Sequence, residues 1–240
     1  MDSILHNVSG TALDQNPFGW SVPTTGMKLP SADADLRVLQ NVGVKIRFVR
    51  NETIFNEGDD ATSCYKVVSG AVRLCKHMTD GRRQIADFLL AGDIFGFMQL
   101  GQYKFTAEAV SDVVLMRYPQ RQVAQLSSTT PGLRGRLLVL FSERIMSMQD
   151  QLLMLGRQTA TERVASFLLQ MAQRSDAEEG LAFELPMSRQ DIADYLGLTI
   201  ETVCPVLSAL KRKRVIATPN TGEVVLNDFD ALRALTDAGE

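Results

Sequence analysis

Apolar and polar positions along the chain first separate an N-terminal stretch from a β-rich one. Residues 1–30 contain Gly, Pro and small polar residues without sustained periodicity, which predicts an irregular arm. Residues 31–130 contain short alternating runs rich in Val, Ile, Phe and Tyr, and turn signals such as Asp80-Gly81 recur about every 11 residues. This pattern predicts an antiparallel sandwich or barrel. The expected strands are residues 45–48, 64–68, 71–75, 84–89 and 113–118.

A long helical pattern follows over residues 131–156. Its apolar residues recur at steps of four and three and form a single stripe. An isolated stripe usually packs on its own domain. Because this one runs for about seven turns between two domain-like segments, we favour a helix that pairs two chains into a homodimer. The stripe consists of Leu133, Leu137, Phe141, Ile145, Met148, Leu152 and Leu155, and Gly156-Arg157 is the expected hinge.

Residues 157–240 predict a winged helix-turn-helix. After a helix over 161–174 and a strand over 181–185, Ser188 is placed to cap a helix that ends at Gly197. Thr199 is placed to cap a second helix that ends at Arg212. Two short helices joined by a turn with Gly form a helix-turn-helix. Residues 215–218 and 223–226 are the expected hairpin of the wing.

The second of these helices carries the candidate chemistry. In a helix-turn-helix its N-terminal residues face the major groove of double-stranded DNA. A carboxylate such as Glu201 is repelled by phosphate, so in the groove it accepts a hydrogen bond from a cytosine amino group. The alternative is a carboxylate favoured only by the helix dipole. Likewise, the cations Lys211 to Arg214 either bind phosphate or form a solvated face.

Composition narrows the class of protein. With 45% apolar and 22% charged residues the chain is globular, and a net charge of -3 means that DNA binding must rest on a local cationic patch. Apolar stretches fall well short of the roughly 20 residues that span a bilayer, so we expect a cytoplasmic protein without a membrane partner. Three scattered cysteines favour neither a disulfide framework nor a zinc site. With two histidines and no Walker A or HExxH motif, we expect no enzyme activity.

Two longer motifs carry a family resemblance. Residues 161–168 (TERVASFL) and 188–203 (SRQDIADYLGLTIETV), together with the Gly-rich strands and the long apolar helix, resemble the Crp/Fnr regulators over about residues 40–235. The C-terminal part and residues 80–85 (DGRRQI) are similar to the FixK-like branch. The resemblance implies an α+β fold with an N-terminal β-roll sensor domain (a cupin-like double-stranded β-helix), a dimerisation helix and a winged helix-turn-helix. It further implies RNA polymerase as a partner, control of microaerobic, nitrogen-fixation or denitrification genes, and a palindrome of the TTGA-N6-TCAA kind.

Residue by residue, the resemblance makes Glu201 the base-reading glutamate and puts Cys204 where Ser is usual. Pro205 departs from the family, which usually carries Arg there to bind guanine. Pro inside a helix costs about 3 kcal/mol and cannot donate to a base, so either the DNA site is altered or DNA binding is impaired. In the second case the chain is a degenerate interaction protein. The candidate DNA-binding set is Ser188, Arg189, Thr199, Ile200, Glu201, Thr202, Cys204, Pro205, Ser208, Lys211 and Arg212.

We expect no cofactor. Residues 96–109 lack the Arg that holds a cyclic phosphate in family members, and Glu108 stands where an anion is unwelcome. No Cys precedes Cys64, which excludes an iron-sulfur cluster of the family type. One alternative remains open: Cys75 and His77, on one face of a strand, would be haem ligands as in carbon-monoxide-sensing relatives. The commoner interpretation is a core cysteine beside an exposed histidine.

Cys204 is the redox candidate of the sequence. Near a helix N-terminus a thiolate is stabilised and becomes open to oxidation to sulfenic or sulfinic acid. The added negative charge would repel DNA. The alternative is a neutral thiol without a regulatory role.

Overall fold

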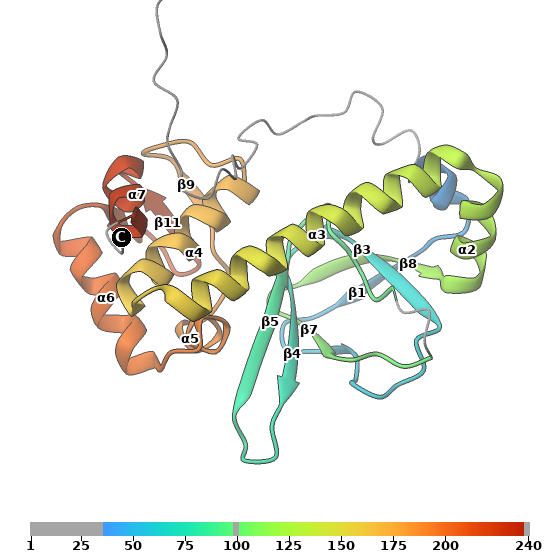
Figure 1. Cartoon of the computed structure of the whole chain (residues 1–240), viewed down its shortest axis with the longest axis horizontal. Helices are drawn as coiled ribbons and strands as arrows, with labels where there is room; N and C mark the ends of the chain where they lie inside the picture. Colours follow the sequence, from blue (N-terminus) through green and yellow to red (C-terminus); the bar gives the residue numbers. More distant parts are fainter. Residues whose placement is uncertain (1–35, 98–100, 238–240) are drawn as a thin grey trace, which may run out of the picture.

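The structure, a computed structural model, describes residues 36–97 and 101–237. The arm expected over residues 1–30 lies outside the described residues. The chain forms a β-rich domain and a helical C-terminal domain, and a long helix, α3 (Pro131–Arg157), runs from one to the other (Figure 1).

The N-terminal domain is the expected β-roll. Two antiparallel sheets of four strands each face one another, and the apolar residues of their inner faces, such as Phe55, Val67 and Leu115, form its core. One sheet consists, in order, of β1 (Val44–Phe48), β8 (Val113–Pro119), β3 (Ser63–Ser69) and β6 (Ile94–Phe95). The other consists of β2 (Thr53–Phe55), β7 (Thr106–Ala109), β4 (Val72–His77) and β5 (Arg83–Leu89). All five expected strands are present. The short strands β2, β6 and β7 were not predicted.

Strands β4 and β5 form a long hairpin that extends from the roll, downward in Figure 1, and passes beside the C-terminal domain. Its turn is the predicted Asp80-Gly81, and Gly81 adopts a φ of 84°, which favours glycine. The hairpin carries Arg73, Cys75, His77 and Arg83. It is therefore the part of the roll from which side chains meet the helices.

Two helical segments pack on the roll, and a third begins there and continues to the C-terminal domain. They are η1 (Val38–Asn41), α2 (Gln120–Thr129) and α3 (Pro131–Arg157), which begins with proline at a position where its missing N–H costs nothing. Leu133 and Leu137 of the predicted stripe are buried within this domain, against residues such as Leu39 and Tyr118. These two residues of the predicted stripe therefore pack on their own domain, which is the alternative to pairing with a second chain.

The exposed apolar row of α3 begins one turn later than predicted. Leu138 joins Phe141, Ile145, Met148 and Leu152, all of them more than 40% exposed. Their spacing of three and four residues is the a/d spacing of a coiled coil. Most of the exposed large apolar side chains among the described residues lie on α3.

Helix α3 is firmly attached to the next helix. Gly156 lies inside α3, and the chain turns at Gln158 and Thr159, which are extended. The guanidinium of Arg163 donates to the carbonyl oxygens of Leu155, Gln158 and Leu196, each at 2.9 Å. The expected hinge is thus a junction fixed by hydrogen bonds to three segments.

The C-terminal domain contains the expected helix-turn-helix and wing. Its elements are α4 (Ala160–Arg174), β9 (Ala182–Glu184), α5 (Arg189–Leu196), α6 (Ile200–Arg212), β10 (Ile216–Ala217), β11 (Glu223–Leu226) and α7 (Phe229–Asp237). The strands form a sheet in the order β10, β11, β9. Helix α7, which packs on α4, was not predicted.

No single helix among the described residues is long and apolar enough to cross a membrane. Only α5 and α6 together reach the length and apolar composition of a membrane span, and they are bent by 108° relative to each other.

The two domains share one apolar cluster. Phe88 of β5 lies with its ring centroid 5.1 Å from that of Tyr195 of α5 and 6.2 Å from that of Phe167 of α4. Ile85 and Cys75 of the hairpin belong to the same cluster. The hairpin is thereby packed directly against the helix-turn-helix.

Candidate nucleic-acid interface

Helix α5 begins with a complete capping box. The Ser188 hydroxyl accepts a hydrogen bond from the backbone N–H of Asp191 at 3.0 Å, and the Asp191 carboxylate accepts one from the Ser188 N–H at 3.0 Å. The Ser188 hydroxyl also donates to this carboxylate at 2.7 Å. The predicted cap is confirmed, and it uses only one of the two carboxylate oxygens of Asp191.

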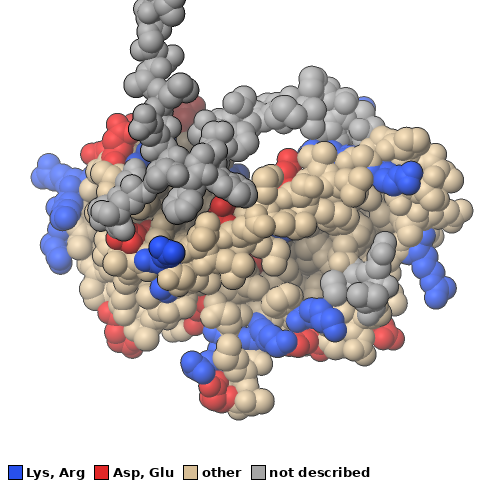
Figure 2. All heavy atoms as spheres, in the orientation of Figure 1, with Lys and Arg blue, Asp and Glu red and all other residues tan. Residues whose placement is uncertain are grey.

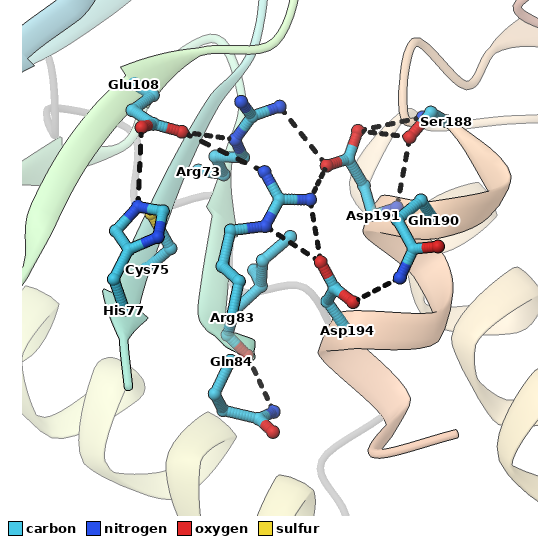
Figure 3. A network of polar contacts seen from close by, with 11 residues as sticks. Arg73, Cys75, His77, Arg83, Gln84, Glu108, Ser188, Gln190, Asp191 and Asp194 are labelled. Atoms are coloured by element: carbon cyan, nitrogen blue, oxygen red, sulfur yellow. Dashed lines mark hydrogen bonds and ion pairs between the residues drawn. The ribbon is translucent and has the colours of Figure 1, made fainter. Parts of the chain in front are cut away.

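The other oxygen of Asp191 binds two arginines of the β-roll (Figure 3). It lies 3.1 Å from Arg73 Nη1 and 2.6 Å from Arg83 Nη2. Arg83 also reaches Asp194, one turn along α5, at 2.7 Å. Arg73, which binds Asp191 through Nη1, also donates from Nε to Glu108 Oε2 of β7 at 2.7 Å. An ion-pair network therefore connects strands β4, β5 and β7 to the first helix of the helix-turn-helix.

The network determines the charge state of Asp191. Burial alone would raise the pKa of this carboxyl, but the hydrogen bonds from Ser188 and the positive charges of Arg73 and Arg83 outweigh it and hold the pKa below its usual value. Sequence reasoning missed this network because Arg73 and Asp191 are 118 residues apart. No local motif signals such a pair.

The turn between the two helices follows the sequence prediction. Gly197 has a left-handed φ of 62° and ends α5, and the helices meet at a bend of 108°. Thr199 occupies the N-cap position of α6, but its hydroxyl accepts no backbone hydrogen bond and instead lies 3.2 Å from the Thr202 hydroxyl. The expectation of a side-chain cap at Thr199 is therefore wrong. The Thr199 hydroxyl instead interacts with the side chains of Thr202 and Glu201.

Helix α6 has one buried and one exposed face. Val203, Leu207 and Leu210 are buried in the domain core. Steps of four and three on the opposite side place Glu201, Pro205 and Ser208 on one exposed row, at the end of which Arg212 is also exposed. Ile200, Thr202 and Cys204 are partly exposed beside this row. The helix continues unbroken through Pro205, although Pro205 has no backbone N–H to donate to the Glu201 carbonyl.

Glu201 is fully ionised on this face. Its own backbone N–H, then the Thr199 hydroxyl, hold the pKa of the carboxyl below its usual value. An acidic group in the first turn is also favoured by the helix dipole. Glu201 therefore offers only acceptor atoms at neutral pH.

Cations gather where α6 ends. Lys211, Arg212, Lys213 and Arg214 are all exposed, and Figure 2 shows Lys and Arg side chains together at this end of the molecule, on the left. Lys211 Nζ donates to the Thr218 hydroxyl in the wing at 2.6 Å, so one cation of the run is held against β10 and its turn. At the other end of the helix pair, Ser188 is exposed and Arg189 is partly exposed.

The cofactor candidates lie elsewhere. Cys75 and His77 do share a face, with Cys75 fully buried and the His77 side chain 55% exposed. Neither residue lines the hollow of about 680 Å³ beside η1 and β1 or the hollow of about 520 Å³ between α3 and α4. Glu108 directs its carboxylate to Arg73 rather than to an open cavity, and residues 98–100 of the stretch compared with cyclic-nucleotide sites lie outside the described residues. The expectations about haem and cyclic nucleotides stay predictions.

Known proteins match the chain over most of its length. A family described as the Crp-like helix-turn-helix domain matches residues 162–235, and the cyclic nucleotide-binding domain matches residues 45–130, the region of the β-roll. The nitrogen fixation regulation protein FixK of Azorhizobium caulinodans is 42% identical over 90% of this chain and 88% of its own length. FixK of Rhizobium meliloti is 40% identical over 76% of this chain and 82% of its own length. The structure of FixK2 from Bradyrhizobium japonicum superimposes with a TM-score of 0.78 at 36% identity, over 83% of this chain and all of that one.

Fold, interface and relatives define the class of protein. It is a DNA-binding transcription regulator in which a winged helix-turn-helix is joined to a β-roll, and the relatives are regulators rather than enzymes. Within this class, the chain belongs to the Crp/Fnr family and, inside it, to the FixK-like branch.

Proposed function

We propose that the chain acts as a cytoplasmic homodimer that binds a palindromic DNA site and regulates transcription together with RNA polymerase. The observation that carries this proposal is the exposed row of α6, Glu201, Pro205 and Ser208, on the face opposite the buried one. In a helix-turn-helix this face enters the major groove. The names of the relatives support nitrogen fixation, and by extension microaerobic growth or denitrification, as the process controlled.

The proposed domain organisation assigns one task to each part. Residues 31–130 form the effector-like β-roll, 131–156 the dimerisation helix and 157–240 the DNA-binding domain. The apolar row from Leu138 to Leu152 supports dimerisation, because five apolar side chains at a/d spacing remain exposed on a single chain. A second copy of the same helix provides the matching surface.

The proposed contacts to DNA divide into two groups. Ile200, Glu201, Thr202, Cys204 and Ser208, with Thr199, face the base edges. Ser188 and Arg189 at the start of α5, and Lys211 and Arg212 at the end of α6, bind phosphates. Cations and hydroxyls near helix ends are typical phosphate ligands.

Selection of bound sequences from a random DNA pool tests the proposal. The purified protein should enrich a two-fold symmetric site, and its affinity should fall steeply as salt rises, because bound phosphates release counterions. If mild oxidation abolishes this enrichment in the unmodified protein but not in Cys204→Ser, Cys204 has the proposed redox role. Absence of enrichment under reducing conditions would contradict the proposal and favour a degenerate interaction protein.

Replacing Glu201 by Ala is expected to relax sequence preference at one base pair of each half-site. The discrimination at that position should fall about ten-fold, because the cytosine amino group loses its acceptor, while non-specific affinity changes little. Competition titrations with singly substituted operators measure this. Glu178→Ala, an exposed glutamate outside α6, is the control, and an unchanged preference in Glu201→Ala would remove Glu201 from the base-reading set.

Replacing Pro205 by Arg is expected to tighten binding to a TTGA-N6-TCAA palindrome by about 1–3 kcal/mol per half-site. The arginine supplies a bidentate donor to guanine. Pro205→Ala is the matched control, since it restores the backbone N–H of the helix without adding that donor. Fluorescence anisotropy with this palindrome should separate the two variants. Equal affinities would show that α6 docks in a different orientation.

A further inference from the structure

Three side chains of the types that commonly bind metals, Cys75, His77 and Glu108, lie together on the β4–β7 pair (Figure 3). Cys75 Sγ is 3.7 Å from His77 Nε2, and His77 Nε2 is 3.7 Å from Glu108 Oε1. All three ligand atoms lie within 4.8 Å of one another. Cys75 is fully buried, whereas the half-exposed imidazole of His77 connects the cluster to solvent.

We propose that Cys75, His77 and Glu108 form a binding site for one zinc-like divalent cation. Zinc bonds of about 2.3 Å to sulfur and about 2.0–2.2 Å to nitrogen and oxygen keep tetrahedral ligand atoms about 3.3–3.6 Å apart. Two of the separations, at 3.7 Å, lie within a few tenths of an ångström of this range, and the third, between Cys75 and Glu108, is at most 4.8 Å. A set of one thiolate, one imidazole and one carboxylate favours zinc over calcium or magnesium, which prefer oxygen ligands.

A hydrogen bond from Arg73 orients the Glu108 carboxylate for metal binding. Arg73 Nε binds Glu108 Oε2 at 2.7 Å, which leaves Oε1 directed toward His77. Metal-binding carboxylates and histidines are usually held by such second hydrogen bonds. Arg73 binds Asp191 of α5 with its other end, at 3.1 Å. A single guanidinium thus separates the proposed site from the helix-turn-helix.

The charges of the network suit a divalent cation in spite of the two arginines. Arg73 and Arg83 contribute two positive charges, and Glu108, Asp191 and Asp194 contribute three negative ones. The thiolate form of Cys75 brings the sum to minus two, which one divalent ion neutralises. Because cysteine binds metals as the thiolate, one thiol proton is released for each ion bound.

Cobalt(II) titration of the full-length protein, stripped of metal with a chelator and kept reduced, tests the site directly. We expect one cobalt ion per chain with a sulfur-to-cobalt charge-transfer band, displaced by zinc. Zinc affinity is then measured by competition with a chromophoric chelator. Absence of the charge-transfer band would overturn the proposal.

Variants identify the ligands. His77→Gln changes a half-exposed side chain and should leave the fold intact, yet weaken zinc binding by at least about 100-fold. Cys75→Ser should abolish the charge-transfer band. Cys204→Ser, which removes the partly exposed cysteine in α6, should bind zinc as the unmodified protein does. Unchanged affinity in His77→Gln, or loss of the band in Cys204→Ser, would refute the assignment.

Discussion

Replacing Asp191 by Ala is expected to lower the free energy of unfolding by about 3–5 kcal/mol. The carboxylate is almost completely buried and binds the guanidinium groups of Arg73 and Arg83. Its removal leaves these partly buried cations without one of their counterions, and it also removes half of the α5 capping box. Urea unfolding at neutral pH measures the change.

The control for Asp191→Ala is Asp230→Ala, which removes an exposed carboxylate that pairs with Arg233 on α7. An exposed pair of this kind contributes little, so the change should stay within about 0.5 kcal/mol. Equal effects of the two substitutions would mean that the network does not stabilise the domain contact.

The Asp191 effect should also depend on pH. Because the folded-state pKa of Asp191 is lowered, its contribution is fully present above the unfolded value of about 3.9 and is lost as the pH falls through the folded pKa. The stability difference between the unmodified protein and Asp191→Ala should therefore shrink in acid. Unfolding curves at neutral pH and in the acid range test this sign.

Replacing Ile145 and Leu152 together by Glu is expected to convert the proposed dimer into monomers. Both side chains are more than half exposed on α3, so the fold of one chain should persist while the apolar row is disrupted. A monomer binds one half-site without the effective concentration that the partner provides. Affinity for a full palindrome should fall about 10²–10⁴-fold.

Sedimentation equilibrium and DNA titration measure the two consequences of this change. Gln149→Glu adds a charge to an exposed position of α3 outside the row and should leave both the dimer and its DNA affinity intact. A double variant that still sediments as a dimer would place the dimer contact on another surface.

Elements with strong periodicity were predictable from the sequence. The five longer strands, α3 and the pair α5 and α6 each have a repeat of two or 3.6 residues, and Gly81 and Gly197 mark turns that need positive φ. The short strands β2, β6 and β7 have too few residues to establish a period, whereas the equally short β9, β10 and β11 were predicted from their place beside the helix-turn-helix. Helix α2 has a mainly polar sequence with one buried residue, Val123, so its pattern is weak.

Other features depend on contacts that no local pattern contains. The apolar stripe of α3 was predicted, but Leu133 and Leu137 turn into the β-roll while Leu138 takes the exposed position. In a helix with 3.6 residues per turn, positions that repeat every seven residues rotate gradually around the helix axis. The first part of the stripe therefore faces the β-roll and the later part faces solvent. Glu108 and Asp191, which connect the domains, lie far apart in the sequence, and only the folded chain brings them to the same arginines.

The Arg163 junction would restrict the spacing between the two half-sites of the DNA that a dimer can bind. Since Arg163 binds the end of α3, the segment before α4 and the end of α5, the helix-turn-helix has little freedom to swing relative to the dimer helix. In a dimer the distance between the two copies of α6 would then be fixed. The number of base pairs between the half-sites becomes as strict a requirement as their sequence, and insertion of one base pair rotates one half-site by about a tenth of a helical turn away from its reader.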